Sequence, residues 1–204
     1  MEMLPWIFTS GWASGINAYL VVLLLGGADR LFGLAQVPDA LARTDVLVVA
    51  AVLFLVDAVA DKIAYVDSTW DAVHTVIRPA IGAAIAALIV GDAGTLEQAL
   101  AATAGGITAL ASHAVKAGLR AAVNTSPEPA SNVVVSVGED VGVASVVSLA
   151  IVAPWLAAGI AAILLFVGMT VVLVLLRRIL AWRRDRRNRV GGAGRPSLRD
   201  ARAP

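Results

Sequence analysis

Long runs of Ala, Val, Leu and Ile alternate along the chain with short polar stretches, and this pattern divides the sequence into six predicted helices. Several of the runs reach the length of about 17–25 residues that spans a bilayer as a helix. The predicted helices cover residues 11–27, 46–60, 69–90, 96–123, 137–153 and 155–182. The pattern predicts an all-α, polytopic membrane protein with about six transmembrane helices.

Polar residues in the connections mark where helices are expected to begin. Ser68 with Asp71, and Ser136 with Glu139, have the spacing of capping boxes, in which a hydroxyl and a later carboxylate pair with backbone amides. The segment NTSPEPASN, residues 124–132, holds two prolines and is predicted to be a loop or an extended segment. These signals predict starts for the third and fifth helices near residues 69 and 137.

Two similar segments, GINA at residues 15–18 and GITA at residues 106–109, suggest an internal repeat. The two halves, residues 11–91 and 95–182, would then hold three helices each. An odd number of helices per half inserts the halves in opposite orientations, as in many secondary transporters. Helices rich in alanine and glycine also resemble one another by chance, so both interpretations stay open.

Composition supports a membrane location. The chain has 204 residues, of which 59% are hydrophobic and 15% are charged. The charged fraction lies well below the roughly 25% of soluble domains, and the mean hydropathy is +0.82. The sequence has no cysteine, which excludes disulfides and Cys-based zinc sites.

Charge is distributed unevenly. The chain up to Leu176 has six Lys or Arg against 13 Asp or Glu, a charge of −7, whereas the last 28 residues have ten Arg and two Asp. The positive-inside rule puts the carboxyl end in the cytoplasm, and six crossings put the amino terminus there too, as expected for an integral protein of the cell (inner) membrane. Residues 1–182 would form the membrane domain, and residues 183–204 a basic, disordered tail.

The basic end predicts contact with anionic lipid headgroups. A nucleic-acid partner is not expected. The arginines proposed to bind headgroups are Arg177, Arg178, Arg183, Arg184, Arg186 and Arg187.

The most informative stretch is DAVADKIAYVDSTWDAVHTVIRP, which places many ionisable groups between apolar runs. Asp57 and Asp61 are four residues apart, so both carboxylates project from one helix face. An ionised carboxylate at membrane depth costs at least about 2.5–3.5 kcal/mol. A bound cation, a shared proton or a basic partner such as Lys62 or Arg78 has to offset that cost. A fixed internal salt bridge is the structural alternative.

Other polar groups join this set of candidates. Each also has a structural explanation, such as helix capping, a proline kink, snorkelling or packing. Pro79 leaves the carbonyl of Thr75 without its helical donor, which makes Thr75 a candidate cation ligand. The remaining candidates for ion or substrate binding are Asn17, Asp67, Asp71, His113, Glu139 and Asp140, with Lys116 and Arg120 on the same helix face as His113.

Three motifs carry a family resemblance. GINAYLVVLLLG, ADKIAYVDSTWDAVHTVIRPAIGA and HAVKAGLRAAVNTSPEPASNVVVSVGED resemble the bacterial integral membrane family catalogued as domain of unknown function 4126, over about residues 11–158. That resemblance implies a membrane location and no particular substrate. More loosely, DAVADK is similar to the acidic helices of small cation-exporter families, although Ala60 replaces their Gly and Ile63 their hydroxyl.

The sequence therefore predicts a small transporter or channel for a cation, divalent or proton-coupled, bound by intramembrane carboxylates. One alternative is a transporter of anions or lipid headgroups that uses Arg78, His113, Lys116 and Arg120. Another is a structural membrane subunit, because Ala101 and Gly105 have the small-residue spacing of helix association. No nucleophile–base pair or metal motif indicates an enzyme, no cofactor is expected, and a homo-oligomer is compatible with the pattern.

Overall fold

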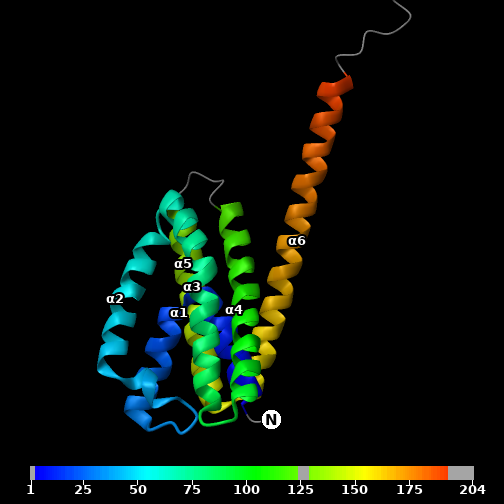
Figure 1. Cartoon of the computed structure of the whole chain (residues 1–204). Coiled ribbons are helices and arrows are strands. Elements are labelled where there is room, and N and C mark those ends of the chain that lie inside the picture. The colour runs from blue at the N-terminus through cyan, green and yellow to red at the C-terminus, as the bar shows by residue number, and fades with distance from the viewer. Residues whose placement is uncertain (1–2, 124–128, 193–204) are drawn as a thin grey trace, which may run out of the picture. The chain divides into compact units, whose positions relative to one another are not determined.

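The computed structural model describes residues 3–123 and 129–192 (Figure 1). All regular elements in these residues are helices. In chain order they are α1 (Leu4–Phe32), a short 3-10 helix η1 (Asp39–Ala42), α2 (Thr44–Ala60), α3 (Ala64–Val90), α4 (Thr95–Val123), α5 (Pro129–Val152) and α6 (Pro154–Gly192). The chain divides into two compact units, residues 1–168 and 169–204. The helical bundle described below belongs to the first unit.

In the part of the chain that the structure describes, four helices are long and apolar enough to cross a membrane. The qualifying segments are Leu4–Phe32, Val66–Val90, Ala130–Val152 and Pro154–Arg184. The helices α2 and α4 do not belong to this set, and α2 has only 17 residues. The prediction of an all-α protein with several helices suited to a bilayer is confirmed.

The helix α1 is broken in its middle. Asn17 has extended backbone angles, with φ at −148° and ψ at 92°, between two helical arms. Its side-chain oxygen accepts a hydrogen bond of 3.0 Å from the backbone N–H of Leu20. That bond is the N-cap interaction typical of asparagine. Asn17 therefore ends the first arm and caps the second.

The two arms of α1 run in opposite directions and lie side by side. Ser10 of the first arm and Leu25 of the second line the same small cavity. The glycine at the far end of the second arm, Gly26, approaches the backbone of Leu41 in η1. The start of α1 and the connection to α2 lie at the same end of the bundle (Figure 1). The helix α1 is thus a helical hairpin with Asn17 at its tip.

Small residues let α1, α3 and α4 approach one another closely. A side chain at Gly15 would overlap the backbone of Ala109 in α4. A Cβ atom at Gly105 would lie 2.6 Å from the carbonyl oxygen of Gly82 in α3. Gly105 belongs to the spacing that predicts helix association, and it serves that purpose inside the chain. The close approach brings polar side chains of the three helices within hydrogen-bonding distance of each other.

Three predicted helix starts are wrong. The first helix begins at Leu4 instead of residue 11, and the third at Ala64 instead of residue 69. The fifth begins at Pro129 instead of residue 137, so residues 129–132 are helical, and the rest of the predicted loop lies outside the described residues. A proline is well tolerated in the first helical turn because its missing N–H has no partner there. The two proposed capping boxes therefore lie inside helices.

The segments that suggested a repeat have different conformations. Residues 15–18 contain the break of α1, whereas residues 106–109 lie within the continuous helix α4. The inverted repeat finds no support in these segments. In the second unit, α6 continues through the arginine run to Gly192, beyond the predicted end at residue 182. The last part of the predicted tail, residues 193–204, lies outside the described residues.

The close helix contacts lead to a stability prediction. Replacing Gly105 by Leu should lower the free energy of unfolding by about 3 kcal/mol or more, because the side chain would press against the α3 backbone. Gly159→Leu is the matched control, since a Cβ atom at Gly159 meets nothing within 4 Å. Thermal unfolding in detergent, followed by size-exclusion chromatography, measures both variants. Equal stability of the two would contradict the close packing of α3 against α4.

Candidate functional site

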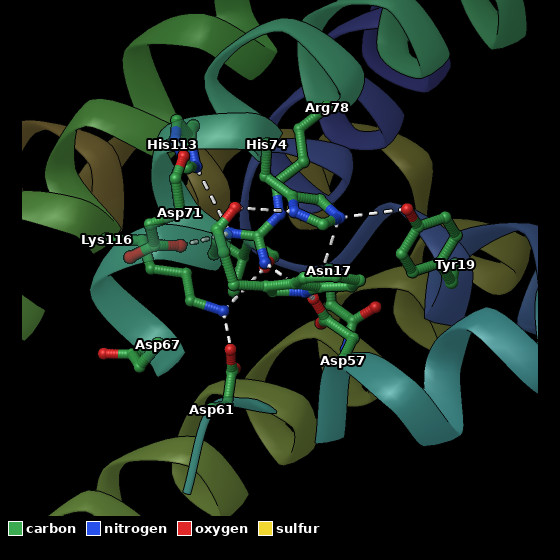
Figure 2. A network of polar contacts seen from close by, with 12 residues as sticks. Asn17, Tyr19, Asp57, Asp61, Asp67, Asp71, His74, Arg78, His113 and Lys116 are labelled. Carbon is green, nitrogen blue, oxygen red and sulfur yellow. Dashed lines mark hydrogen bonds and ion pairs between the residues drawn. The ribbon is translucent and has the colours of Figure 1, made fainter. Parts of the chain in front are cut away.

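A buried network of polar side chains surrounds the tip of the α1 hairpin (Figure 2). Its members come from α1, the end of α2, the first half of α3, the second half of α4 and α5. The side chains of Asp57, Arg78 and His74 are at most 1% exposed. The ionisable groups that the sequence places in separate helices therefore meet in one interior site.

Arg78 organises the first part of the network. Its Nη2 atom donates to Oδ1 of Asp57 at 3.1 Å, and its Nη1 atom donates to Oδ1 of Asp71 at 3.4 Å. The indole N–H of Trp70 donates to the same Asp57 oxygen at 2.6 Å. Arg78 was predicted as a basic partner for Asp57, and it pairs with Asp57 and also with Asp71.

Lys116 and Arg120 organise the second part. Both donate to Oδ2 of Asp61, at 2.8 and 3.1 Å. Arg120 also binds Glu139 through Nε and Nη2, the latter at 2.8 Å, and its Nη1 atom lies 3.8 Å from Asp67. These cations are buried in the site, so the interpretation that they snorkel to the membrane surface is wrong.

The break in α1 supplies two further polar contacts. The Nδ2 atom of Asn17 donates to Oδ1 of Asp140 on α5 at 2.8 Å. The carbonyl of Ile16, at the end of the first arm, accepts a hydrogen bond of 3.2 Å from the Lys116 ammonium. A helix C-terminus has partial negative charge and a helix N-terminus partial positive charge. The two arms therefore present opposite partial charges at the middle of the bundle.

The hydrogen bonds of His113 define its protonation state. Its Nδ1 atom lies 3.2 Å from Arg78 Nη1, which can only donate. Its Nε2 atom lies 3.1 Å from the carbonyl oxygen of Asp71, which can only accept. His113 is therefore neutral, with the proton on Nε2. Thr75 supports this arrangement with its hydroxyl 3.1 Å from the same Nε2 atom.

His74 has a different set of partners. Its Nδ1 atom lies 2.8 Å from the carbonyl oxygen of Trp70 and donates to it. Its Nε2 atom lies 2.9 Å from the Tyr19 hydroxyl and 3.9 Å from Oδ1 of Asp57. A second proton on Nε2 would face a hydroxyl oxygen and a carboxylate, both of which accept hydrogen bonds. A proton on Nε2 of His74 would thus face two acceptors, whereas a proton on Nδ1 of His113 would face the Arg78 guanidinium.

The charges in the network do not balance. The described part of the site contains three basic side chains, Arg78, Lys116 and Arg120. The carboxylates that meet them or lie beside them are Asp57, Asp61, Asp67, Asp71, Glu139 and Asp140. Burying surplus negative charge is far more costly than protonating a carboxyl or binding a cation. The network therefore has to hold protons or cations in addition to its own side chains.

Two cavities reach the network from different sides. A cavity of about 390 Å³ lies among α1, α4, α5 and the start of α6, and is bordered by Lys116 and Glu139. A second cavity, of about 250 Å³, lies between α3 and α4 and is bordered by Asp71 and Arg120. Groups at both edges of the network are thus adjacent to open volume.

The structure brings nearly all predicted site residues together. The exception is Lys62, whose ammonium donates to the carbonyl of Ala58. The lysine that pairs with Asp61 is Lys116. Among described residues no group of three or more Asp, Glu or His side chains is arranged to hold a metal ion. The predicted residues found in or beside the network are Asn17, Asp57, Asp61, Asp67, Asp71, Thr75, Arg78, His113, Glu139 and Asp140.

Sequence reasoning missed Tyr19, Trp70 and His74. Helical spacing contained a usable signal for two of them, because Trp70, His74 and Arg78 are four residues apart and share one face of α3. Tyr19 lies in an apolar run, and only the tertiary contact between α1 and α3 identifies it. In the second unit, the six arginines proposed to bind headgroups are exposed, and Arg186 lies over the Trp182 ring at 5.2 Å.

Comparison with known protein families identifies the class of the chain. The family described as Domain of unknown function (DUF4126) matches residues 4–174, and the chain belongs to this family. The match extends the predicted resemblance, which covered about residues 11–158. No curated protein and no solved structure matches the chain.

The charge surplus predicts an asymmetry between cation and carboxylate variants. Arg78→Gln should lower the free energy of unfolding by about 3–5 kcal/mol, because it leaves Asp57 and Asp71 buried without their partner. Asp57→Asn should cost only about 1–2 kcal/mol, because the amide oxygen still accepts from Arg78 and Trp70. Thermal denaturation of the purified variants tests this. Equal losses would show that the network has no surplus of negative charge.

Proposed function

We propose that the protein is a small secondary transporter of the bacterial inner membrane that moves a cation in exchange for protons. The observation that carries the proposal is the surplus of buried carboxylates around the tip of a broken helix. Such a site is more stable when protons or cations occupy it. The protons or cations that balance the charge are not part of the chain, so they can be exchanged.

The break in α1 supports this function. Transporters typically place their binding sites where a helix is interrupted near the middle of the membrane, because the exposed helix ends can bind charged groups. Here the first arm ends at the Ile16 carbonyl, and the second arm begins at the Asn17 cap. Irregular backbone at such a depth is tolerated where protein surrounds it, as it does at the buried Asn17.

His74 and Asp57 are the groups that we assign to proton exchange. The Oδ2 atom of Asp57 has no hydrogen-bond partner among the described residues, although its Oδ1 atom has two. A proton on His74 would lie between Tyr19 and Asp57. Proton uptake by this pair would weaken the ion pair between Asp57 and Arg78. Arg78 also pairs with Asp71. Protonation in the first part of the network thereby affects its neighbouring carboxylates.

The two alternatives are less well supported. An anion would have to displace carboxylates that already occupy Arg78, Lys116 and Arg120. A structural subunit needs no surplus charge, because balanced ion pairs hold helices together as well as unbalanced ones. Cation exchange is the proposal that explains why the carboxylates outnumber the basic side chains.

We further propose that α1 enters and leaves the membrane from one side, and that α2 to α6 cross it. The positive-inside rule places the arginine run of α6 in the cytoplasm. Five crossings then put the amino terminus on the outer side, in place of the cytoplasmic position expected from six crossings. The α3–α4 connection, which includes Asp92, stays on the outer side.

The transport proposal predicts a specific loss of proton flux. In liposomes with an internal pH dye, opposing gradients of protons and of Na⁺, K⁺ or Mg²⁺ should give protein-dependent pH changes. Asp57→Asn should slow them about tenfold or more, because it removes a titratable group. The control is Asp45→Asn, which alters an exposed carboxylate paired with Arg43 at the membrane surface. Undiminished flux in Asp57→Asn would remove this residue from the mechanism.

The topology proposal predicts the sidedness of two positions. The chain has no cysteine, so single cysteines can be labelled without background. Met3→Cys and Asp92→Cys should both react with a membrane-impermeant maleimide from the periplasmic side in spheroplasts. Labelling of position 92 alone, with position 3 reacting only after lysis, would indicate that α1 crosses the membrane.

A further inference from the structure

The larger cavity has features that the exchange of an inorganic cation does not require. It encloses about 390 Å³, and most of the residues around it are apolar. A proton or a small metal ion needs neither that volume nor an apolar wall. A site of this kind is typical of an organic ligand, which fills the volume and is oriented by a few polar groups.

The polar end of the cavity is formed by Glu139. The Glu139 side chain is 16% exposed, compared with 2% for the neighbouring Lys116 and 1% for Arg120. Asp61 is 3% exposed, and its Oδ2 atom lies 2.8 Å from the Lys116 ammonium. Lys116 also lines the cavity, but its ammonium donates to Asp61 and to the Ile16 carbonyl. The most exposed charged group at the cavity is therefore the Glu139 carboxylate, whose other partner is Arg120.

An aromatic side chain lines the same cavity. Trp12, from the first arm of α1, lines it together with Ile16, one turn further along. An indole ring attracts cations through the negative face of its π system, and this attraction strengthens where water is excluded. A carboxylate and a tryptophan in an apolar pocket are a combination that favours a large, weakly hydrated cation.

We propose that this cavity binds a monovalent organic cation with an apolar body, such as a quaternary ammonium or phosphonium ion. The charged centre would lie near Glu139 and Trp12, and the apolar groups would contact Val115, Leu119 and Leu164. This inference rests on the proposed function and names its substrate class. Entry of the cation would supply positive charge to a network with surplus carboxylates, so that a proton can leave.

Glycines provide the space for the occupant. Gly138 and Gly142 flank Glu139 on α5 and line the cavity, and a Cβ atom at either position would meet nothing within 4 Å. A larger side chain can therefore be added at Gly142 without a clash in the empty protein. It would occupy volume that the ligand needs. This allows the cavity to be filled without altering any ion pair of the network.

Tetraphenylphosphonium is a suitable probe, and tetraphenylborate is an anion of the same shape. Equilibrium dialysis with the full chain in phosphatidylcholine nanodiscs, corrected by empty nanodiscs, should show saturable binding of tetraphenylphosphonium. Gly142→Leu should weaken it about tenfold or more by occupying the cavity. Gly159→Leu, at an open position outside the cavity, should bind as the wild type does. Glu139→Gln should also weaken binding, and tetraphenylborate should not compete.

Several results would overturn the inference. Unsaturable uptake that equals that of empty nanodiscs would show partition into lipid only. Equal affinity in Gly142→Leu and wild type would place the probe elsewhere, and competition by tetraphenylborate would indicate an apolar groove that accepts lipid chains. Asp57-dependent proton flux in a wild-type protein that does not bind tetraphenylphosphonium would leave the proposed function standing and remove this substrate class. Saturable binding with no Asp57-dependent proton flux, even under a gradient of tetraphenylphosphonium, would instead overturn the transport proposal.

Discussion

The structure depends on the high cost of burying charge in an apolar interior. Within a bilayer the hydrophobic effect does not drive helices together, so packing and polar contacts determine how they associate. In α2 only Ala50, Asp57 and Ala60 are buried. Two carboxylates at the carboxyl end of this helix, Asp57 within it and Asp61 directly after it, pair with Arg78 of α3 and with Lys116 and Arg120 of α4. The same ion pairs that hold the helices form the candidate site.

The hairpin of α1 places its tip inside this polar network. Its glycines allow the first arm to approach α4 closely enough for Ser112 to donate to the carbonyl of Trp12. The hairpin tip brings Asn17 to Asp140 and the Ile16 carbonyl to Lys116. A straight helix would satisfy these backbone groups internally and would leave Lys116 with one acceptor fewer. The break, the cavity and the charge network are thus consequences of one arrangement.

Much of the site was predictable because ionisable residues are rare and costly in apolar helices. Each candidate carboxylate stands out from its surroundings in the printed sequence, and helical spacing places Asp57 and Asp61 on one face. The partners were harder to predict, because they lie on other helices. Lys62 is the neighbour of Asp61 in sequence, yet Lys116, 55 residues away, is its neighbour in space. Tyr19 gave no signal, since aromatic residues are common in membrane helices for other reasons.

By itself the sequence determined the helical class and the presence of unusual charges within apolar helices, because hydropathy and length are local properties. Helix starts were less certain, since a proline such as Pro129 is compatible with both a loop and a first turn. Only the tertiary structure decided that α1 turns back at Asn17. In the sequence, a single asparagine within an apolar run does not distinguish a broken helix from a continuous one. The tertiary structure also decided which basic side chain pairs with which carboxylate. It brings more carboxylates than basic side chains into one buried site. Those properties depend on contacts between distant segments, which no local pattern encodes.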